Sequence, residues 1–313
     1  MHSFDIAIPN YNYGRYLRDC VESVLSQRDV NVRLLIVDNG STDDSAIIAR
    51  QLAKEDHRIE LRLREKNLGP HASFNEGIEW ADAEFFLVLC SDDLLAPNVL
   101  IEAANFLDQN RNVNLVYGRM SKILADTQRA DIVVDHRDTN WRIRSGIDYI
   151  GTCCRNAISL IDGPLAISRT DVQKKVGYYR SQLAHTDDME MWLRFATYGD
   201  IGQSDAIQAY IRWHPQSRSA DISGILQWNR EVENAFISFF EHEGRNLHNR
   251  RQHLEEVGNC LSKRAYWSAI SNAVRREKGA AALFVDALKR KPLMAILPPF
   301  DYLLNRAARR KYL

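Results

Sequence analysis

Two adjacent carboxylates, Asp92 and Asp93, follow the apolar run Phe85–Leu89 in this chain of 313 residues. An uninterrupted apolar run rich in Phe, Val and Leu is typical of a strand covered on both faces. Ligands of open α/β sheets bind beyond the carboxyl ends of such strands. Two carboxylates close together there repel each other unless a cation neutralises them. Oxygen ligands favour Mg²⁺ or Mn²⁺, which usually arrive with substrate phosphates, so the pair suggests a divalent-cation site.

The same two residues also allow a purely structural role. The apolar spacing predicts a helix over residues 98–109, and an Asp just before a helix is a common N-cap. From residues 85–97 alone, a cation site and a helix cap remain equal alternatives.

Other acidic residues also stand where predicted strands end or helices begin. Asp38 follows the predicted strand 33–37 and opens the sequence DNGS, which by itself favours a turn. Asp187 and Asp188 stand at the start of a predicted helix over 188–197, where Asp188 could simply be the N-cap.

Taken together and in this order, the motifs resemble the family-2 glycosyltransferases of the GT-A fold over roughly residues 4–219. They are IPNYN at 8–12, VDNGSTD at 37–43, Asn67 with Gly69, Asn75 with Gly77, LCSDD at 89–93, DDMEMWLR at 187–194 and YIRWH at 210–214. Each motif is weak alone, and the ordered set is what carries the resemblance.

The resemblance implies a role for each matching residue. A nucleotide-sugar donor would contact Pro9, Tyr11, Asn12, Asp38, Asn39, Asn67, Gly69, Asn75 and Ser91. A divalent cation, Mn²⁺ or Mg²⁺, would be held by Asp92, Asp93 and His214, although a lone His is more often an ordinary hydrogen-bonded residue. Asp188 would be the catalytic base, and Asp187 would assist it.

Three positions depart from the family's pattern. Cys90 stands where the metal motif often has its first Asp, Asn39 where a second Asp is frequent, and Asp187 where a Glu is frequent. None of these departures removes Asp92 or Asp188, so the resemblance still implies an active enzyme.

The resemblance implies a metal-dependent, inverting glycosyltransferase. It would move a sugar from a nucleotide-sugar donor, with a UDP-sugar favoured, to a saccharide or glycolipid acceptor. The process implied is surface polysaccharide or glycoconjugate biosynthesis. The alternative, suggested by Cys90, is a non-catalytic sugar-nucleotide-binding or scaffolding protein. A sugar nucleotidyltransferase would need a glycine-rich, Arg-containing loop after the first strand, and a nicotinamide oxidoreductase a GxGxxG motif; the sequence has neither there.

The composition fits a soluble globular protein, with 45% apolar and 26% charged residues. No stretch reaches the ~18 apolar residues of a spanning helix, and the first residues do not resemble a signal peptide. The five cysteines form no CxxC pair, which favours reduced thiols and a cytoplasmic location.

The formal net charge of zero hides an asymmetry along the chain. Residues 245–313 hold 15 Lys and Arg against 5 Asp and Glu, a net of +10, and the remainder is at −10. The apolar segment LMAILPPFDYLL at 293–304 lies between basic clusters, which fits contact with the inner face of an anionic membrane. Packing on the catalytic domain or homodimerisation is the favoured alternative, and it is compatible with membrane contact. Nucleic acid is not an expected partner, because the basic residues are not interleaved with stacking aromatics.

Alternating strands and helices with short links predict an α/β fold, a GT-A (Rossmann-like), mostly parallel sheet wound with helices, followed by an all-helical extension. We expect a catalytic domain over residues 1–220 and a helical region over 221–313. The predicted strands are 4–8, 33–37, 59–63, 85–89, 113–117, 163–168 and 207–213. The predicted helices are 16–27, 43–55, 70–80, 98–109, 171–177 and 188–197. Residues 120–159 are expected to be an excursion of strand and loop.

Overall fold

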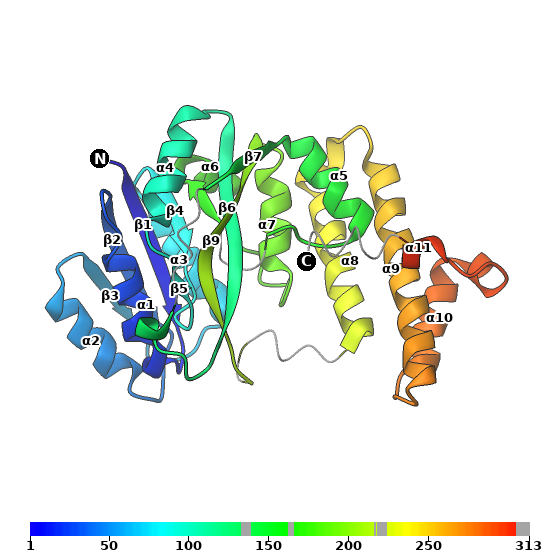
Figure 1. Ribbon diagram of the computed structural model, residues 1–313, viewed down its shortest axis with the longest axis horizontal. Coiled ribbons are helices and arrows are strands. Elements are labelled where there is room, and N and C mark those ends of the chain that lie inside the picture. The colour runs from blue at the N-terminus through cyan, green and yellow to red at the C-terminus, as the bar shows by residue number, and fades with distance from the viewer. Residues whose placement is uncertain (133–138, 162–165, 216, 218–223, 305–313) are drawn as a thin grey trace. The chain divides into compact units, whose positions relative to one another are not determined.

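The computed structural model describes residues 1–132, 139–161, 166–215, 217 and 224–304 (Figure 1). The chain divides into two compact units. Unit 1 comprises residues 1–146, 161–181 and 198–215, and Unit 2 comprises residues 147–160, 182–197 and 216–313. This grouping joins 147–160 and 182–197 to the C-terminal helices, and the functional division at residue 220 stays a prediction.

Unit 1 is built on a sheet whose strand order is β3-β2-β1-β4-β8-β6-β9-β5, with β7 paired to β9. The strands are β1 (Ser3–Asn10), β2 (Asn31–Asp38), β3 (Ile59–Leu63), β4 (Phe85–Val88), β5 (Leu94–Leu95), β6 (Val113–Leu124), β7 (Trp141–Arg144), β8 (Ile167–Arg169) and β9 (Asp200–Trp213). The first four strands in this order are parallel, as predicted, and so is the pair β6–β9. The sheet is nevertheless mixed, because β5, β7 and β8 pair antiparallel with their neighbours.

The helices of Unit 1 connect these strands and supply one side of its core. They are α1 (Gly14–Leu25), α2 (Ser45–Glu55), α3 (Pro70–Trp80), α4 (Val99–Gln109) and α6 (Thr170–Val176), with the 3₁₀ turn η1 (Arg129–Asp131). All four residues of β4 are buried, which explains why its sequence is continuously apolar rather than alternating. Phe4, Ile6 and Ile8 of β1 are buried in one cluster with Leu17 and Val21 of α1. Each such side chain contributes about 1.5–3 kcal/mol when it is fully removed from water.

The regular secondary structure in the described residues of Unit 2 is all helical. It contains α5 (Gly146–Asn156), α7 (Asp187–Phe195), α8 (Gly224–Glu241), η3 (Glu243–Asn246), α9 (Arg250–Val274), α10 (Ala280–Arg290), η4 (Pro292–Ala295) and α11 (Asp301–Leu304). Its C-terminal helices share a small core that includes Ala265 and Tyr266 of α9 and Leu283 and Ala287 of α10. The predicted all-helical C-terminal extension is therefore confirmed over 224–304. None of the helices in the described residues has the length and apolar character that a membrane span requires.

One helix is missing from the sequence-based assignment. Residues 146–156 form α5, whereas we expected part of an excursion of strand and loop. The helical signal was present, because the buried residues Tyr149, Ile150, Cys153, Cys154 and Ala157 repeat at the spacing of one helical face. The polar character of the surrounding stretch concealed it. The predicted strand 163–168 is found only at its end, since residues 162–165 lie outside the described part of the chain.

Candidate active site

The carboxyl ends of β1 and β2 meet in a polar network centred on the buried side chain of Asp38. Nδ2 of Asn10 donates to Oδ1 of Asp38 at 2.8 Å, and the Ser41 hydroxyl donates to the same oxygen at 2.6 Å. The backbone N–H of Ser41 donates to Oδ2 at 3.2 Å. Asn10 and Asp38 are register partners at the last positions of their parallel strands, which brings them together. The turn role that the sequence allowed for Asp38 is present, and its contact with a nucleotide stays a prediction.

The IPNYN motif joins this network through Asn12. Its backbone N–H donates to the Ser41 hydroxyl at 3.0 Å, and its Oδ1 accepts from the backbone N–H of Thr42 at 2.7 Å. Asn12 has φ of 59°, a left-handed conformation in which Asn is enriched. Pro9 lies in β1, and the side chain of Tyr11 is 42% exposed at the end of that strand. Three of the predicted donor-binding residues are thus close together in the sequence and beside the Asp38 turn.

Asn39 holds the next loop in place. Its Nδ2 donates to Oδ1 of Asn67 at 2.8 Å and to the carbonyl of Gly69 at 3.0 Å, and its Oδ1 accepts from Nη1 of Arg64 at 2.9 Å. A carboxylate at this position could not donate to the two oxygens. The departure from Asp to Asn is therefore matched to its surroundings. The sequence did not single out Arg64, which also forms an ion pair with Glu76 of α3 at 2.5 Å.

Asn75 of α3 is used in a reciprocal pair with a backbone segment of the same unit. Its Nδ2 donates to the carbonyl of Tyr179 at 3.0 Å, and its Oδ1 accepts from the Tyr179 N–H at 2.8 Å. The amide positions α3 against the loop after α6. Donor contact by Asn75 stays a prediction.

The acidic pair lies between β4 and β5, and both side chains are buried. Oδ2 of Asp92 lies 3.0 Å from Nε2 of His214, which follows β9. Oδ1 of Asp93 accepts from the backbone N–H of Arg212 at 3.0 Å. The structure therefore brings together the three residues predicted to hold a cation. Ser91 lies just before the pair and is also buried, with a hydroxyl that has no hydrogen-bond partner among the described residues.

The helix-cap alternative for this pair is not found. α4 begins at Val99 and its N-cap residue is Asn98, so neither carboxylate reaches the cap position. The two residues instead precede β5, a short strand that the sequence did not predict and that pairs with β9.

Burial and mutual repulsion disfavour two ionised carboxylates at the pair, and Arg212 offsets part of that effect. Burial raises the pKa of Asp93 well above its ordinary value, and the neighbouring Asp92 raises it further. Burial and the charge of Asp92 also raise the pKa of the Tyr13 hydroxyl. Its ring meets that of His214 edge-on at a centroid distance of 5.1 Å. These shifts show a concentration of negative charge in a poorly solvated place.

The chemistry of the donor set fits a divalent cation. In the described residues, one ligand atom each from Cys90, Asp92 and Asp93 lies within 4.8 Å of the others. Carboxylate oxygens and the neighbouring imidazole suit Mn²⁺ or Mg²⁺, whereas a thiolate prefers softer metals. By this chemistry the predicted ligands Asp92, Asp93 and His214 suit such a cation better than the thiol of Cys90, although Cys90 belongs to the same cluster. The Cys90 carbonyl accepts from the Cys20 thiol at 3.4 Å.

Arg212 is a further residue of this site that sequence reasoning missed. Its side chain is buried, its Nε donates to the carbonyl of Asp92 at 3.1 Å, and its Nη1 donates to the carbonyl of Thr127 at 2.7 Å. Its guanidinium carbon lies 4.6 Å from the ring centroid of Tyr16. Arg212 thus connects the loop that carries Asp92 and Asp93, here called the acidic loop, to the end of β6. It also supplies a fixed positive charge beside that loop.

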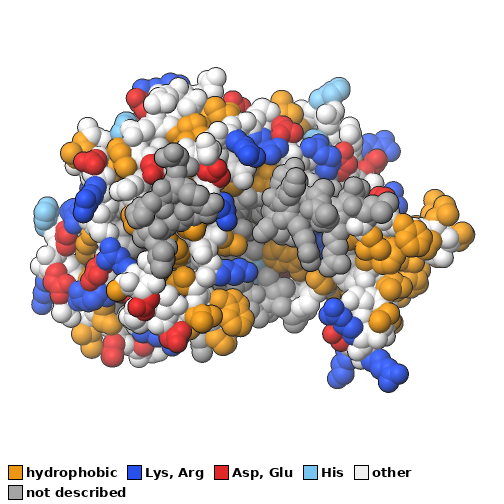
Figure 2. All heavy atoms as spheres, in the orientation of Figure 1, with side chains coloured by type: hydrophobic (Ala, Val, Ile, Leu, Met, Phe, Trp, Pro, Cys, Tyr) orange, Lys and Arg blue, Asp and Glu red, His pale blue; other side chains and the backbone are white. Residues whose placement is uncertain are grey.

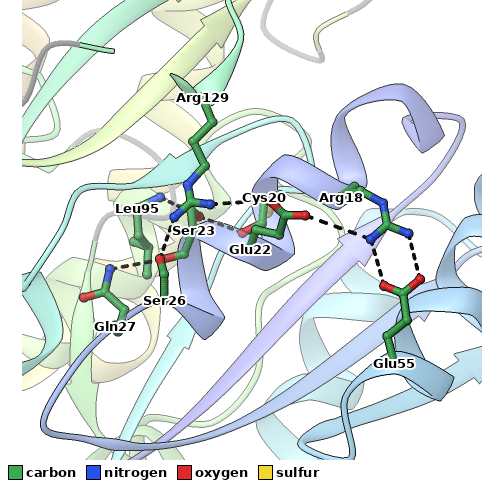
Figure 3. Close-up of polar contacts among 9 residues, drawn as sticks. All are labelled: Arg18, Cys20, Glu22, Ser23, Ser26, Gln27, Glu55, Leu95 and Arg129. Carbon is green, nitrogen blue, oxygen red and sulfur yellow. Dashed lines mark hydrogen bonds and ion pairs between the residues drawn. The ribbon is translucent and has the colours of Figure 1, made fainter. Parts of the chain in front are cut away.

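Side chains of α1 also hold the strand that follows the acidic pair, and Figure 3 shows the contact of Ser23 with Leu95. The hydroxyl of Ser23 accepts from the backbone N–H of Leu95 at 3.0 Å, and Nε2 of Gln27 donates to the carbonyl of Ala96 at 2.8 Å. Both side chains are buried. Polar residues on the inner side of α1 therefore hold β5, and with β5 the carboxylates that precede it.

The outer side of α1 carries the ion pairs that Figure 3 also shows. Nη2 of Arg129 donates to the Ser26 hydroxyl at 2.7 Å, and its Nη1 lies 3.4 Å from Glu22. Arg18 pairs with Glu55 of α2 at 2.8 Å. These pairs are partly solvated, so each contributes at most about 1 kcal/mol.

Asp187 and Asp188 occupy the first turn of α7, which begins one residue earlier than predicted. The N-cap position belongs to Thr186, so Asp188 is not the cap, although its Oδ1 accepts from the Met189 N–H at 2.6 Å. Asp187 is buried and Asp188 is half-buried. A helix N-terminus favours the ionised carboxylate. Both residues belong to Unit 2, and their catalytic roles stay predictions.

Comparison with known proteins supports the family resemblance found in the sequence. Residues 5–158 match the family model described as glycosyl transferase family 2. Glycosyltransferase GlyG of Streptococcus pneumoniae is 34% identical over 113 residues, which are 36% of this chain and 37% of the relative. An uncharacterized glycosyltransferase of Haemophilus influenzae is 36% identical over 113 residues, which are 36% of this chain and 45% of the relative. The chain thus matches less than half the length of these curated relatives.

Solved structures share the fold at low sequence identity. S. aureus TarS 1–349 in complex with UDP-GlcNAc superposes with a TM-score of 0.66 at 18% identity, covering 91% of this chain and 79% of that one. The mannosyltransferase PcManGT from Pyrobaculum calidifontis, solved with GDP-Man and Mn²⁺, gives a TM-score of 0.54 at 15% identity, covering 98% and 86%. The family predicted from the sequence is confirmed for residues 5–158, which match glycosyl transferase family 2. The predicted GT-A fold is confirmed by the solved structures.

Proposed function

We propose that this protein is a metal-dependent, inverting glycosyltransferase that moves a sugar from a nucleotide-sugar donor to a saccharide or glycolipid acceptor. The observation that carries the proposal is the meeting of Asp92, Asp93 and His214 just beyond a buried parallel strand of Unit 1. A departing nucleoside diphosphate needs positive charge at such a place, and a cation between these ligands supplies it.

The donor side of the proposal rests on the network at the ends of β1 and β2. Asp38 keeps acceptor capacity beyond its contacts with Asn10 and Ser41, so it can accept from the N–H of a pyrimidine base. The backbone around Asn12 and the loop at Asn67 and Gly69 are fixed by their own hydrogen bonds. A preformed loop of this kind costs little ordering entropy when a ligand binds.

The acceptor side rests on Asp188. In one direct displacement, the acceptor oxygen forms a bond to the anomeric carbon, the bond from that carbon to the diphosphate oxygen breaks, and Asp188 takes the acceptor proton. Asp188 lies in the first turn of α7, and a helix N-terminus favours the ionised form of a carboxylate, which is the form that accepts a proton. Asp187 is buried beside it, and we assign it to orienting the acceptor or its neighbour.

UDP is the first nucleotide to test. TarS was solved with UDP-GlcNAc and PcManGT with GDP-Man and Mn²⁺, so UDP-, GDP- and dTDP-sugars form the panel. Surface polysaccharide or glycoconjugate synthesis on the cytoplasmic side of a membrane is the process we propose for the acceptor.

Two measurements test the proposal. Thermal unfolding with each nucleotide sugar and Mn²⁺ should give a rise in melting temperature for the true donor, because a ligand of the native state stabilises it. Transfer to an acceptor should then stop in excess EDTA and return with Mn²⁺ or Mg²⁺. Full activity in excess chelator would contradict the metal role.

The second candidate function is a non-catalytic sugar-nucleotide-binding protein, which Cys90 beside the metal ligands favours. Slow, metal-dependent hydrolysis of the donor without acceptor distinguishes the two functions. The transferase should hydrolyse its donor, whereas a binding protein should show stabilisation by the nucleotide sugar and no hydrolysis.

A further inference from the structure

Unit 2 carries an exposed apolar ridge near its C-terminal end, which we define as Leu293, Ile296, Leu297 and Phe300. The exposed fractions of these side chains are 71%, 78%, 71% and 60%. Figure 2 shows hydrophobic side chains gathered where η4 and α11 lie in Figure 1. Single exposed apolar residues are ordinary on protein surfaces, whereas a contiguous group of large ones usually marks an interaction site.

The ridge backbone is fastened to α9. Nε1 of Trp267 donates to the carbonyl of Pro299 at 2.9 Å, and its ring centroid lies 5.6 Å from that of the ridge phenylalanine. Lys263 of α9 forms an ion pair with Asp301. Within the same segment, Met294 is buried against the core of α9 and α10. The segment is therefore packed through some residues while the four ridge side chains remain outside, so their exposure is a property of the fold.

Basic residues accompany the ridge. α10 ends in Lys289 and Arg290, and Lys291 follows directly before η4. The side chains of Lys289 and Lys291 are exposed, whereas Arg290 is engaged with Glu233. An apolar ridge alone fits any apolar partner, but two exposed lysines that closely precede it in the sequence favour an anionic one.

We propose that the ridge inserts into the interface of a membrane that contains anionic phospholipid, with Lys289 and Lys291 at the headgroups. Shallow insertion of apolar side chains together with attraction of lysines to anionic lipid is the known physical basis of reversible, peripheral attachment. A stable dimer interface buries about 800 Å² per partner and is depleted in lysine, so a second copy is the poorer occupant of a ridge of four side chains that two exposed lysines precede. The inference does not depend on sugar transfer, since attachment is measured without substrate.

Vesicle flotation of the full chain tests the proposal. The protein should float with vesicles of phosphatidylcholine mixed with phosphatidylglycerol, and not with phosphatidylcholine alone. Raising NaCl from roughly 50 mM to 500 mM should release it, because the screening length falls several-fold. A protein that ignores anionic vesicles even at low salt would overturn the inference.

Point variants separate the apolar and the charged contributions. Ile296→Ser and Leu297→Ser should each weaken partition on the order of tenfold, the value of burying one such side chain. Lys289→Gln combined with Lys291→Gln should weaken binding to anionic vesicles by about tenfold or more and lessen its salt dependence. The matched control is Ile47→Ser on α2, since Ile47 is 67% exposed in Unit 1 and should leave partition unchanged.

Two other results would assign the ridge to a different occupant and overturn the proposal. If Ile296→Ser converts a dimer to a monomer in sedimentation and leaves vesicle binding as it was, the ridge is a contact between copies. If the same variant lowers the melting temperature well below that of Ile47→Ser with no change in flotation, the ridge is covered by another part of this chain.

Discussion

Two buried carboxylates at the C-terminal ends of strands in the same sheet have different surroundings. Asp38, at the end of β2, accepts three hydrogen bonds from neutral donors of Asn10 and Ser41. Asp93, beyond β4, has one backbone donor and a second carboxylate as its neighbour, and its pKa is raised by burial and by that neighbour. Neutral donors hold the first carboxylate and leave it lone pairs for a nucleotide, whereas the second lies beside a like charge that a cation would offset. The difference matches the two roles we propose, donor binding for Asp38 and cation binding for Asp93.

A third carboxylate, Asp188, extends this comparison and has the largest expected effect. It is half-buried in the first turn of α7 and is assigned neither to the network nor to the cation. Asp188→Asn keeps its shape and removes proton acceptance, so kcat should fall by roughly 10²–10⁴, or ~3–5 kcal/mol of barrier. Donor affinity, measured by calorimetry with Mn²⁺, should change little.

The neighbouring Asp187 provides the matched control for that experiment. Asp187→Asn makes the same change one residue earlier, and a smaller loss of turnover is expected. If Asp187→Asn is inactive and Asp188→Asn keeps wild-type turnover, the assignment of the base is wrong by one position.

The next largest effect is expected from the predicted cation ligands. His214→Gln removes the imidazole that lies 3.0 Å from Asp92. Loss of a group that only orients a metal ligand typically costs about 10–100-fold in metal affinity, so we expect a loss of at least that size for a direct ligand. Activity should therefore require correspondingly more Mn²⁺, and saturating metal should recover most of it. His242→Gln in Unit 2 is the control, and equal Mn²⁺ titrations for the two variants would remove His214 from the site.

The stability of the Asp38 network gives the sharpest test of the contrast. In Asp38→Asn the side-chain amide would face the backbone N–H of Ser41, so one hydrogen bond is lost and a buried donor is left without an acceptor. Such a change costs about 1–3 kcal/mol, measurable by urea unfolding. The loss should be the same with and without Mn²⁺, and a loss that appears only with metal would mean that Asp38 acts with the cation site.

Asp93→Asn should act in the opposite direction when no cation is present. Because the pKa of Asp93 is raised in the folded state from its ordinary 3.8, its contribution to stability is present below pH 3.8 and is lost as pH rises through the raised pKa. The variant cannot ionise, so it should be the more stable protein at neutral pH in EDTA and should lack that part of the pH dependence. Mn²⁺ should reverse the order by stabilising the wild type more than the variant, as thermal melts across pH can show.

Sequence reasoning located both carboxylate sites, because strand ends in an α/β sheet can be read from local apolar runs and turn sequences. Asp38, Asp92 and Asp93 each follow such a run, and the parallel pairing of β1 with β2 and β4 then places them at one edge. The residues that support these sites could not be predicted in the same way. Arg212 contacts Asp93 across 119 positions in the chain, and no local pattern specifies such a partner.

Short elements and elements in polar surroundings were not predicted from the sequence for a related reason. β5 has two residues, too few for any periodic signal, and it exists because Ser23 and Gln27 bind the backbone on one side while β9 pairs with it on the other. α5 had a helical apolar face that its polar surroundings obscured. The candidate functional residues can thus be predicted individually from local sequence, whereas the residues that hold them in place depend on tertiary contacts.

The smallest expected effect concerns Cys90, which separates proximity from ligation. Its thiol lies within 4.8 Å of ligand atoms of Asp92 and Asp93, yet a hard cation should select the carboxylates and the imidazole. Cys90→Ser should therefore leave Mn²⁺-dependent activity within about twofold, while the affinity for Cd²⁺, a thiolate-seeking ion, should fall by tenfold or more. Cys153→Ser, a buried thiol of α5, is the control for general effects of the substitution. A large loss of Mn²⁺ affinity in Cys90→Ser alone would make the thiol a true ligand, and the position where the family often has an Asp would then keep its metal-binding role through sulfur.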